Sequence, residues 1–180
     1  MVDRRSLTMK DMWGAVGVLA VVLVVVLGLM GTIGFGNDTK NGETPVADVT
    51  GGLQKSAAAL RLPLLIPQGL PADWQPNSFA LTDPFTDGGT RTVVRGGWIT
   101  GSGRFVALIQ STDSPADLIG NEIGPGLTSR AVVAAGGLDW DVYPGQRSEV
   151  SWVHAAGRLA VMITGSASED DFRILAESIA

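Results

Sequence analysis

The sequence predicts an α+β domain, built on a mostly antiparallel sheet, behind one N-terminal transmembrane helix. Between Met12 and Phe35 the chain is apolar and carries no ionisable side chain. Segments 98–119 and 152–173 share one order of strand, turn, strand and helix signals. The chain closes with an amphipathic segment, 169–179, typical of a helix that packs on a sheet. We expect about five to seven strands, with the helices on one face of the sheet.

The apolar run 12–35 predicts a membrane anchor that follows a short tail, residues 1–11. As a helix it would extend about 36 Å, more than the hydrocarbon core of about 30 Å. A cleaved signal sequence is the alternative, but its apolar region normally has about 7–15 residues and ends in small residues at a cleavage site. The chain has no cysteine to accept a lipid. We therefore expect residues 12–35 to stay uncleaved in the lipid bilayer.

The charges that flank the anchor predict its orientation. Arg4, Arg5 and Lys10 precede it, and such cations remain on the cytoplasmic side. The expected protein is a single-pass cell-membrane protein with a cytoplasmic N-terminus and an extracytoplasmic C-terminal domain. The short tail leaves no room for a cytoplasmic output domain, so a sensor or regulator would have to act through a partner.

Small residues on one face of the anchor raise the question of helix pairing. Gly28, Thr32 and Gly36 are spaced four apart, which allows two membrane helices to approach closely. Glycine is common in membrane helices for other reasons. A homo-oligomer through this row is therefore the less favoured interpretation.

Residues 36–56 are predicted to be a linker, and residues 57–180 the extracytoplasmic domain. The linker begins with a polar stretch punctuated by Gly and Pro and without periodicity. A short helix over 53–60 is expected to end before Pro63, because proline disfavours the helical conformation of the residue before it. The proline-spaced stretch that follows, 63–76, is expected to be extended.

The most informative pattern is a similarity between 98–119 and 152–173, which align without a gap at an offset of 54 residues. Gly103 and Gly157 fall where a hairpin turn needs a positive φ. Each copy predicts a strand, a tight turn, a strand and a helix, which suggests two pseudo-repeated units. The identical positions are Trp98/Trp152, Gly103/Gly157, Arg104/Arg158, Ile109/Ile163, Ser114/Ser168 and Asp117/Asp171.

The helix of each unit has a predicted start. Ser114 and Ser168 are expected N-caps, followed three residues later by Asp117 and Asp171 in the position of a capping box. Pro115 falls at the first helical position, where its missing N–H costs nothing. In the last helix the expected buried face consists of Phe172, Leu175, Ala176 and Ile179.

Composition excludes several classes of function. After residue 36 there are ten Lys and Arg against sixteen Asp and Glu, a net charge of −6 that is unsuited to binding nucleic acid. The absence of cysteine excludes disulfides, thiol catalysis and thiolate metal sites. The anchor contains no ionisable residue, so a transporter or proton relay has no basis in it.

No residue pattern predicts a catalytic, cofactor-binding or metal site. His154 is the single histidine and aligns with Thr100, so we expect an exposed residue beside a turn. Asp139 and Asp141 alternate on one strand face, as solvated carboxylates often do. The stretch 83–88 resembles a calcium loop only superficially, because it lacks the alternating acidic ligands and the final Glu. Trp98 and Trp152 are expected in the core.

The chain resembles an envelope-protein family of high-GC Gram-positive bacteria, domain of unknown function 4245. Four motifs carry the resemblance. It implies a single-pass membrane protein with an external domain, and it carries no catalytic residues or cofactor over to this chain. The motifs are R-x-L-T-x-K-D-M at 5–12, P-x-G-L-P-x-x-W at 67–74, the predicted hairpin 97–110, and V-x-I-T-G-S-A-x-x-x-x-F at 161–172.

The favoured function is a membrane-anchored binding or interaction module of the cell envelope, not an enzyme. Its candidate partners are an envelope protein or a small apolar ligand, besides the bilayer itself. An envelope hydrolase or transferase that uses serine or carboxylate chemistry is one alternative, and a sensor or regulator acting through a partner is another.

The predicted orientation can be tested with single cysteines, because the chain has none of its own. We expect Asn41→Cys to react with a membrane-impermeant thiol reagent on intact cells and Thr8→Cys to react only after lysis. Labelling of Thr8→Cys alone on intact cells would reverse the orientation.

Overall fold

The computed structural model describes residues 47–83, 91–145 and 149–179. The chain divides into two compact units, Met1–Glu43 and Thr44–Ala180, and the described residues belong to the second. The predicted tail, anchor and small-residue row lie outside the described residues, as does most of the linker. Among the described helices, none combines the length and the hydropathy needed to span a bilayer.

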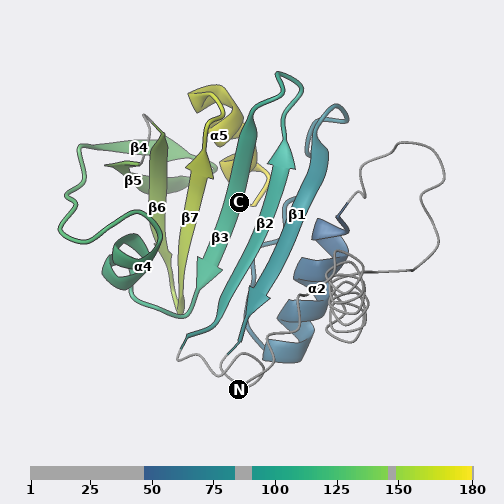
Figure 1. Ribbon diagram of the computed structural model, residues 1–180, viewed down its shortest axis with the longest axis horizontal. Coiled ribbons are helices and arrows are strands. Elements are labelled where there is room, and N and C mark those ends of the chain that lie inside the picture. Colours follow the sequence, from purple (N-terminus) through teal and green to yellow (C-terminus); the bar gives the residue numbers. More distant parts are fainter. Residues whose placement is uncertain (1–46, 84–90, 146–148, 180) are drawn as a thin grey trace, which may run out of the picture. The chain divides into compact units, whose positions relative to one another are not determined.

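A seven-stranded sheet forms the centre of this unit (Figure 1). Every neighbouring pair is antiparallel, and the strand order is β1-β2-β3-β7-β6-β5-β4. The α+β class and the antiparallel sheet are thus confirmed. The strands are β1 (Gln75–Thr82), β2 (Val93–Ile99), β3 (Phe105–Ser111), β4 (Ala131–Ala135), β5 (Leu138–Pro144), β6 (Val150–Ala156) and β7 (Leu159–Gly165).

The described helices lie on both faces of the sheet, so the prediction that they share one face is wrong. α2 (Val49–Leu60) and α5 (Glu169–Glu177) cover one face, whose core contains Val106 and Leu108 of β3. α4 (Pro115–Glu122) covers part of the other face, where Ile109 of β3 packs with Leu118. In Figure 1, α4 lies in front of the sheet and α2 and α5 behind it.

Both predicted repeat units are present, as β2-β3-α4 and β6-β7-α5, but their hairpin loops differ in length. Three residues separate Thr100 from Arg104 in the first hairpin, whereas the second turns over Gly157 and Arg158 alone. Successive side chains of a strand point to opposite faces. After a three-residue loop and a two-residue loop, the residues that the alignment matches therefore point to opposite faces of the sheet. The gapless alignment therefore matches Leu108 of one face with Met162 of the other. This reversal carries α4 and α5 to opposite faces.

The turn and cap predictions are confirmed. Gly103 and Gly157 have φ of 76° and 62°. The Ser114 hydroxyl accepts the Asp117 N–H, with Pro115 in the first turn of the helix. Ser168 and Asp171 form a reciprocal capping box. These local contacts satisfy amides that a helix cannot pair within itself.

α2 begins at Val49, earlier than the predicted helix over 53–60, and its first turns fall within the segment predicted as linker. Asp48 caps the helix by accepting the Gly51 N–H at 2.9 Å. Val49 and Leu53 are 1% and 0% exposed, and both belong to the core. A Cβ on Gly96 would come within 2.6 Å of Val49, so glycine allows α2 to approach β2 closely.

Aromatic side chains fill the core beneath α5. Trp152 meets Phe172 edge to face with ring centroids 5.5 Å apart, and it lies 6.4 Å from the ring of Trp140. Such contacts add to the burial of the rings themselves. Trp98 is 3% exposed, so the predicted core position of both matched tryptophans is confirmed. The predicted buried face of the last helix is confirmed as well: Phe172, Leu175, Ala176 and Ile179 are all buried.

The position of α2 predicts where the domain can be cut. A fragment of residues 46–180 should unfold cooperatively, whereas 57–180 should be destabilised by about 3–6 kcal/mol, since it loses the buried side chains of Val49 and Leu53. Urea unfolding followed by tryptophan fluorescence measures the difference. Equal midpoints for the two fragments would show that α2 does not stabilise the sheet.

Candidate functional site

His154 and the alternating aspartates do not form a catalytic group. His154 of β6 lies beside Trp140 of β5, with ring centroids 5.6 Å apart. Its Nδ1 is 2.8 Å from the Asp139 carbonyl oxygen. It is half-buried within a strand, so the expected exposed position beside a turn is wrong. Asp139 and Asp141 are exposed, and they alternate with Trp140 along β5, so their side chains project from the other face.

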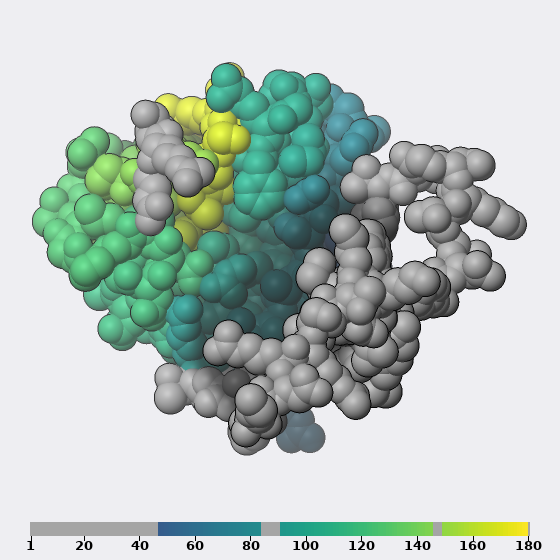
Figure 2. Space-filling model, in the orientation of Figure 1, coloured from purple at the N-terminus to yellow at the C-terminus, as the bar shows by residue number. Residues whose placement is uncertain are grey.

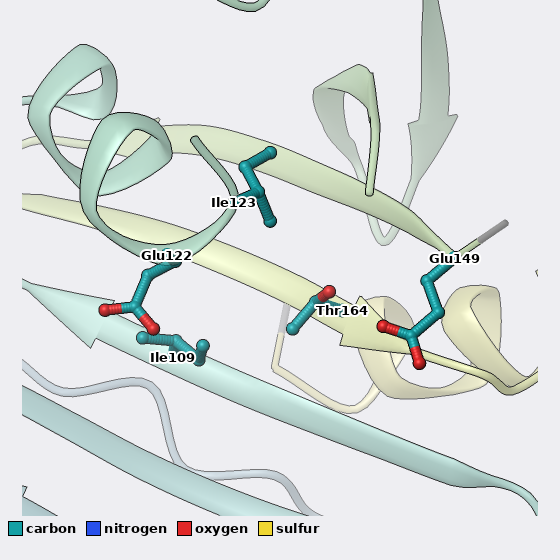
Figure 3. A pocket seen from close by; sticks show the side chains of 5 residues that line it. All are labelled: Ile109, Glu122, Ile123, Glu149 and Thr164. Atoms are coloured by element: carbon teal, nitrogen blue, oxygen red, sulfur yellow. The ribbon is translucent and has the colours of Figure 1, made fainter. Parts of the chain in front are cut away.

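The features that could bind a partner instead lie on the face that α4 covers in part. A hollow of about 220 Å³, which we call the α4 hollow, is lined by Ile109, Glu122, Ile123, Glu149 and Thr164. Figure 3 shows Ile109 and Thr164 on the neighbouring strands β3 and β7, with Glu122 and Ile123 at the end of α4. Figure 2 shows the same side, where the surface recedes between the green residues around α4 and the teal strands.

An ion-pair network fixes one wall of the α4 hollow. Glu122 Oε1 lies 2.6 Å from Arg95 Nη2 and 3.5 Å from Arg91 Nη2, and Arg91 Nη1 is 3.5 Å from Asp113 Oδ2. The side chain of Glu122 is 14% exposed, so little solvent screens its pair with Arg95. The network ties the end of α4 to β2 and holds Glu122 in place.

The opposite wall of the hollow is held by backbone and hydroxyl contacts. Gly145 N–H donates to the Glu149 carbonyl at 2.8 Å and brings both ends of a loop together. The hydroxyls of Ser151 and Thr164 are 2.8 Å apart across β6 and β7. Nearby, burial and, to a smaller extent, the charge of Asp141 raise the pKa of Tyr143 above its ordinary value. The hollow thus has fixed walls, and the strand residues Ile109 and Thr164 line its base.

The sequence did not identify Glu122 or Glu149, which are far apart in the chain. Glu122 is at the end of a helix and Glu149 precedes a strand, and neither belongs to a recognisable motif. Their placement around one hollow depends on α4 lying opposite α5. The loop lengths of the two hairpins, three residues in one and two in the other, are the signal that could have indicated that α4 and α5 lie on opposite faces.

A second recess, which we call the α5 groove, lies between the extended stretch 64–68 and the end of α5. Its volume is about 500 Å³, and its lining combines apolar and polar side chains. Gln68 N–H donates to the Ser178 carbonyl at 2.9 Å and joins the two walls. The lining residues are Leu64, Leu65, Ile66, Gln68, Glu177, Ser178 and Ile179.

Gln110 holds the extended wall of the α5 groove against the sheet. Its Oε1 accepts the Leu65 N–H at 2.7 Å, and its Nε2 donates to the Leu65 carbonyl at 2.8 Å. One side-chain amide thus satisfies both backbone groups of a residue that belongs to no strand. Residues 61–74 contain neither helix nor strand, and β1 begins at Gln75, near the end of the stretch 63–76 that was predicted to be extended.

Candidate metal ligands are dispersed over the described residues. In residues 47–83, 91–145 and 149–179 no group of three His, Asp or Glu side chains is placed to hold an ion. The stretch compared with a calcium loop continues beyond Asp83 into residues that are not described.

The family model described as "Protein of unknown function (DUF4245)" matches residues 4–179. The chain belongs to this family. The match to DUF4245 confirms the resemblance drawn from the sequence motifs and includes both the apolar run 12–35 and the described domain. No curated protein matches the chain, and no solved structure matches it.

The role of Gln110 can be tested by removing its amide. Gln110→Leu should destabilise the domain by about 2–4 kcal/mol, because it leaves the backbone N–H and C=O of Leu65 without their partner. Gln54→Leu, on the exposed side of α2, is the matched control and should change stability by about 0.5 kcal/mol or less. Urea unfolding measures both, and equal effects would refute the role assigned to Gln110.

Proposed function

We propose that this DUF4245 protein is a membrane-anchored binding module whose domain lies outside the cytoplasmic membrane. The apolar run 12–35 supports the anchor, and Arg4, Arg5 and Lys10 support the orientation. The domain would then meet a partner at the cell envelope. Anchoring raises the effective concentration of the domain near a partner in the same membrane.

The α4 hollow is the observation that carries the binding proposal. Its volume of about 220 Å³ is smaller than the roughly 300–1,000 Å³ typical of sites for whole small molecules. A single side chain of a larger partner suits that size better. A lysine or arginine fits the lining chemically, because its methylenes can pack on Ile109 and Ile123 while its charge reaches Glu149.

The enzyme alternative is less well supported by the groups that would have to react. Glu122 already pairs with Arg95. His154 contacts only the backbone carbonyl of Asp139, whereas the carboxylates of Asp139 and Asp141 project from the other face of the sheet. Several serine hydroxyls serve the fold itself, through contacts that a nucleophile would have to give up. Ser114 and Ser168 cap helices, Ser151 bonds Thr164, Ser166 accepts the Phe105 N–H, and Ser178 donates to the Leu175 carbonyl.

The α5 groove favours a second candidate function, the binding of a small apolar ligand. Its volume of about 500 Å³ lies within the range of small-molecule sites, and leucine and isoleucine side chains contribute to its lining. The two candidates use different surfaces, so one experiment can separate them.

The test is a charge reversal at the α4 hollow in the full-length protein. Glu149→Arg should abolish capture of the membrane partners that native protein retains after cross-linking and mass spectrometry, since an arginine would repel the expected basic group. Asp139→Arg makes the same change in charge on an exposed part of β5 and should retain them.

Two results would contradict the proposal. Identical partners for the native protein and Glu149→Arg would exclude the α4 hollow as the docking site. Co-purification of a lipid that is lost on Ile66→Asp, with protein partners unchanged, would favour the α5 groove and a small-ligand carrier instead.

A further inference from the structure

The outer edge of β4 exposes backbone groups that could pair with another strand. The hairpin β4–β5 turns over Gly136 and Gly137, with Ala135 opposite Leu138. Residues that flank a two-residue turn form a hydrogen-bonded pair, and such pairs alternate with non-bonded ones. Ala135, Val133 and Ala131 therefore bond to β5. The N–H and C=O groups of Val132 and Ala134 point outward.

The two edges of the sheet differ in how they are protected. β1 carries Pro76 and an irregular register between Pro76 and Ser78, and α2 packs beside it. These devices discourage strand addition. β4 reads AVVAA, without charge, proline or bulge, and its Val132 is 63% exposed, the more exposed of two large hydrophobic side chains on the surface of the described domain.

We propose that two copies of this chain pair through their β4 strands, antiparallel about a two-fold axis at Val133. In this register Val132 of each copy faces Ala134 of the other in a hydrogen-bonded pair, and the two Val133 residues face each other in a non-bonded pair. The sequence is nearly the same read in both directions around Val133, and each side chain is small. The paired strands would join two sheets into one.

Neighbouring contacts select this register over one centred on Val132. A two-fold axis at Val132 would pair Ala134 with Arg130 of the other copy. The Arg130 N–H is already taken by the Val142 carbonyl at 2.8 Å. An axis at Val133 uses only Val132 and Ala134.

Charge does not oppose the pairing. No ionisable side chain lies within Ala131–Ala135, and Arg130 would face Gly136 of the second copy. Arg173 Nη1 donates to the Ala134 carbonyl at 3.0 Å, and a carbonyl oxygen has a second lone pair for the incoming N–H. Arg173 is itself paired with Glu169 at 2.8 Å, so its charge is balanced.

The experiment uses the full chain, which has no native cysteine, in detergent micelles. Val133→Cys should form a disulfide-linked dimer under mild oxidation, because Cα atoms of a non-bonded antiparallel pair lie about 4.5 Å apart, within the range that a disulfide spans. Ala131→Cys is the matched control. Its two copies would lie about 13 Å apart along the strands, too far for a disulfide.

A second variant distinguishes backbone pairing from non-specific hydrophobic association. Val132→Pro, added to Val133→Cys, removes an outward N–H without touching the bonds to β5, and should lower the yield of dimer by about tenfold, equivalent to about 1.4 kcal/mol. Val132→Ala keeps that N–H and should retain the dimer. Should proline disturb folding, as judged by urea unfolding, Val132→Lys serves in its place.

The outcomes decide the proposal. A disulfide at Val133 that depends on residue 132 in this way supports the two-fold β4 interface. Equal cross-linking of Val133→Cys and Ala131→Cys, a dimer that Val132→Pro and Val132→Lys leave unchanged, or the absence of a dimer would each overturn it. A complex held instead by strand addition from a different protein would appear as a cross-linked product of another mass, and would also overturn it.

Discussion

β3 and β7 pair at the centre of the sheet, and their burial on both faces imposes the architecture around them. Residues 106–111 of β3 and 159–163 of β7 are buried without interruption, although successive side chains point to opposite faces. A strand can be buried in this way only when both faces are covered. α5 meets that requirement on one side and α4 on the other. The close packing extends to backbone, since a Cβ on Gly165 would come within 2.3 Å of the Phe105 carbonyl oxygen.

Local features of the fold could be predicted from the sequence because they depend on neighbouring residues. A capping box is recognised by a serine three residues before an acidic side chain, and a tight turn by a glycine that accepts positive φ; both are visible in any short segment. The sides on which α4 and α5 lie could not be found in this way. They depend on the difference between the three-residue and two-residue hairpin loops, which the gapless alignment of 98–119 with 152–173 concealed. The start of α2 was missed because Gly51 and Gly52 weaken the helical signal, while Val49 and Leu53 stabilise it only through the sheet.

The candidate site was less predictable than the fold. Asp139 and Asp141 were correctly taken as solvated, because alternation along a strand is a local property. The prediction for His154 was wrong for the same reason as the prediction for α4. Aligning His154 with Thr100 assumed hairpin loops of equal length, whereas β6 continues to Ala156. Contacts between segments far apart in the sequence define the roles of Glu122, Glu149 and Gln110. No short motif predicts these roles. Polar residues of this kind can be recognised only after the topology is known.

Arg173 connects the core of the domain to its open edge. Its guanidinium lies 5.7 Å from the ring of Trp152, pairs with Glu169 one turn earlier, and donates to the outward carbonyl of Ala134. The first two contacts are each worth less than about 1 kcal/mol at an exposed position. Together they hold a donor beside β4, where an unsatisfied carbonyl would otherwise depend on water. The same helix that closes the core over Trp152 thus also shapes the edge at which another strand could add. Any association through β4 would therefore be sensitive to how α5 packs.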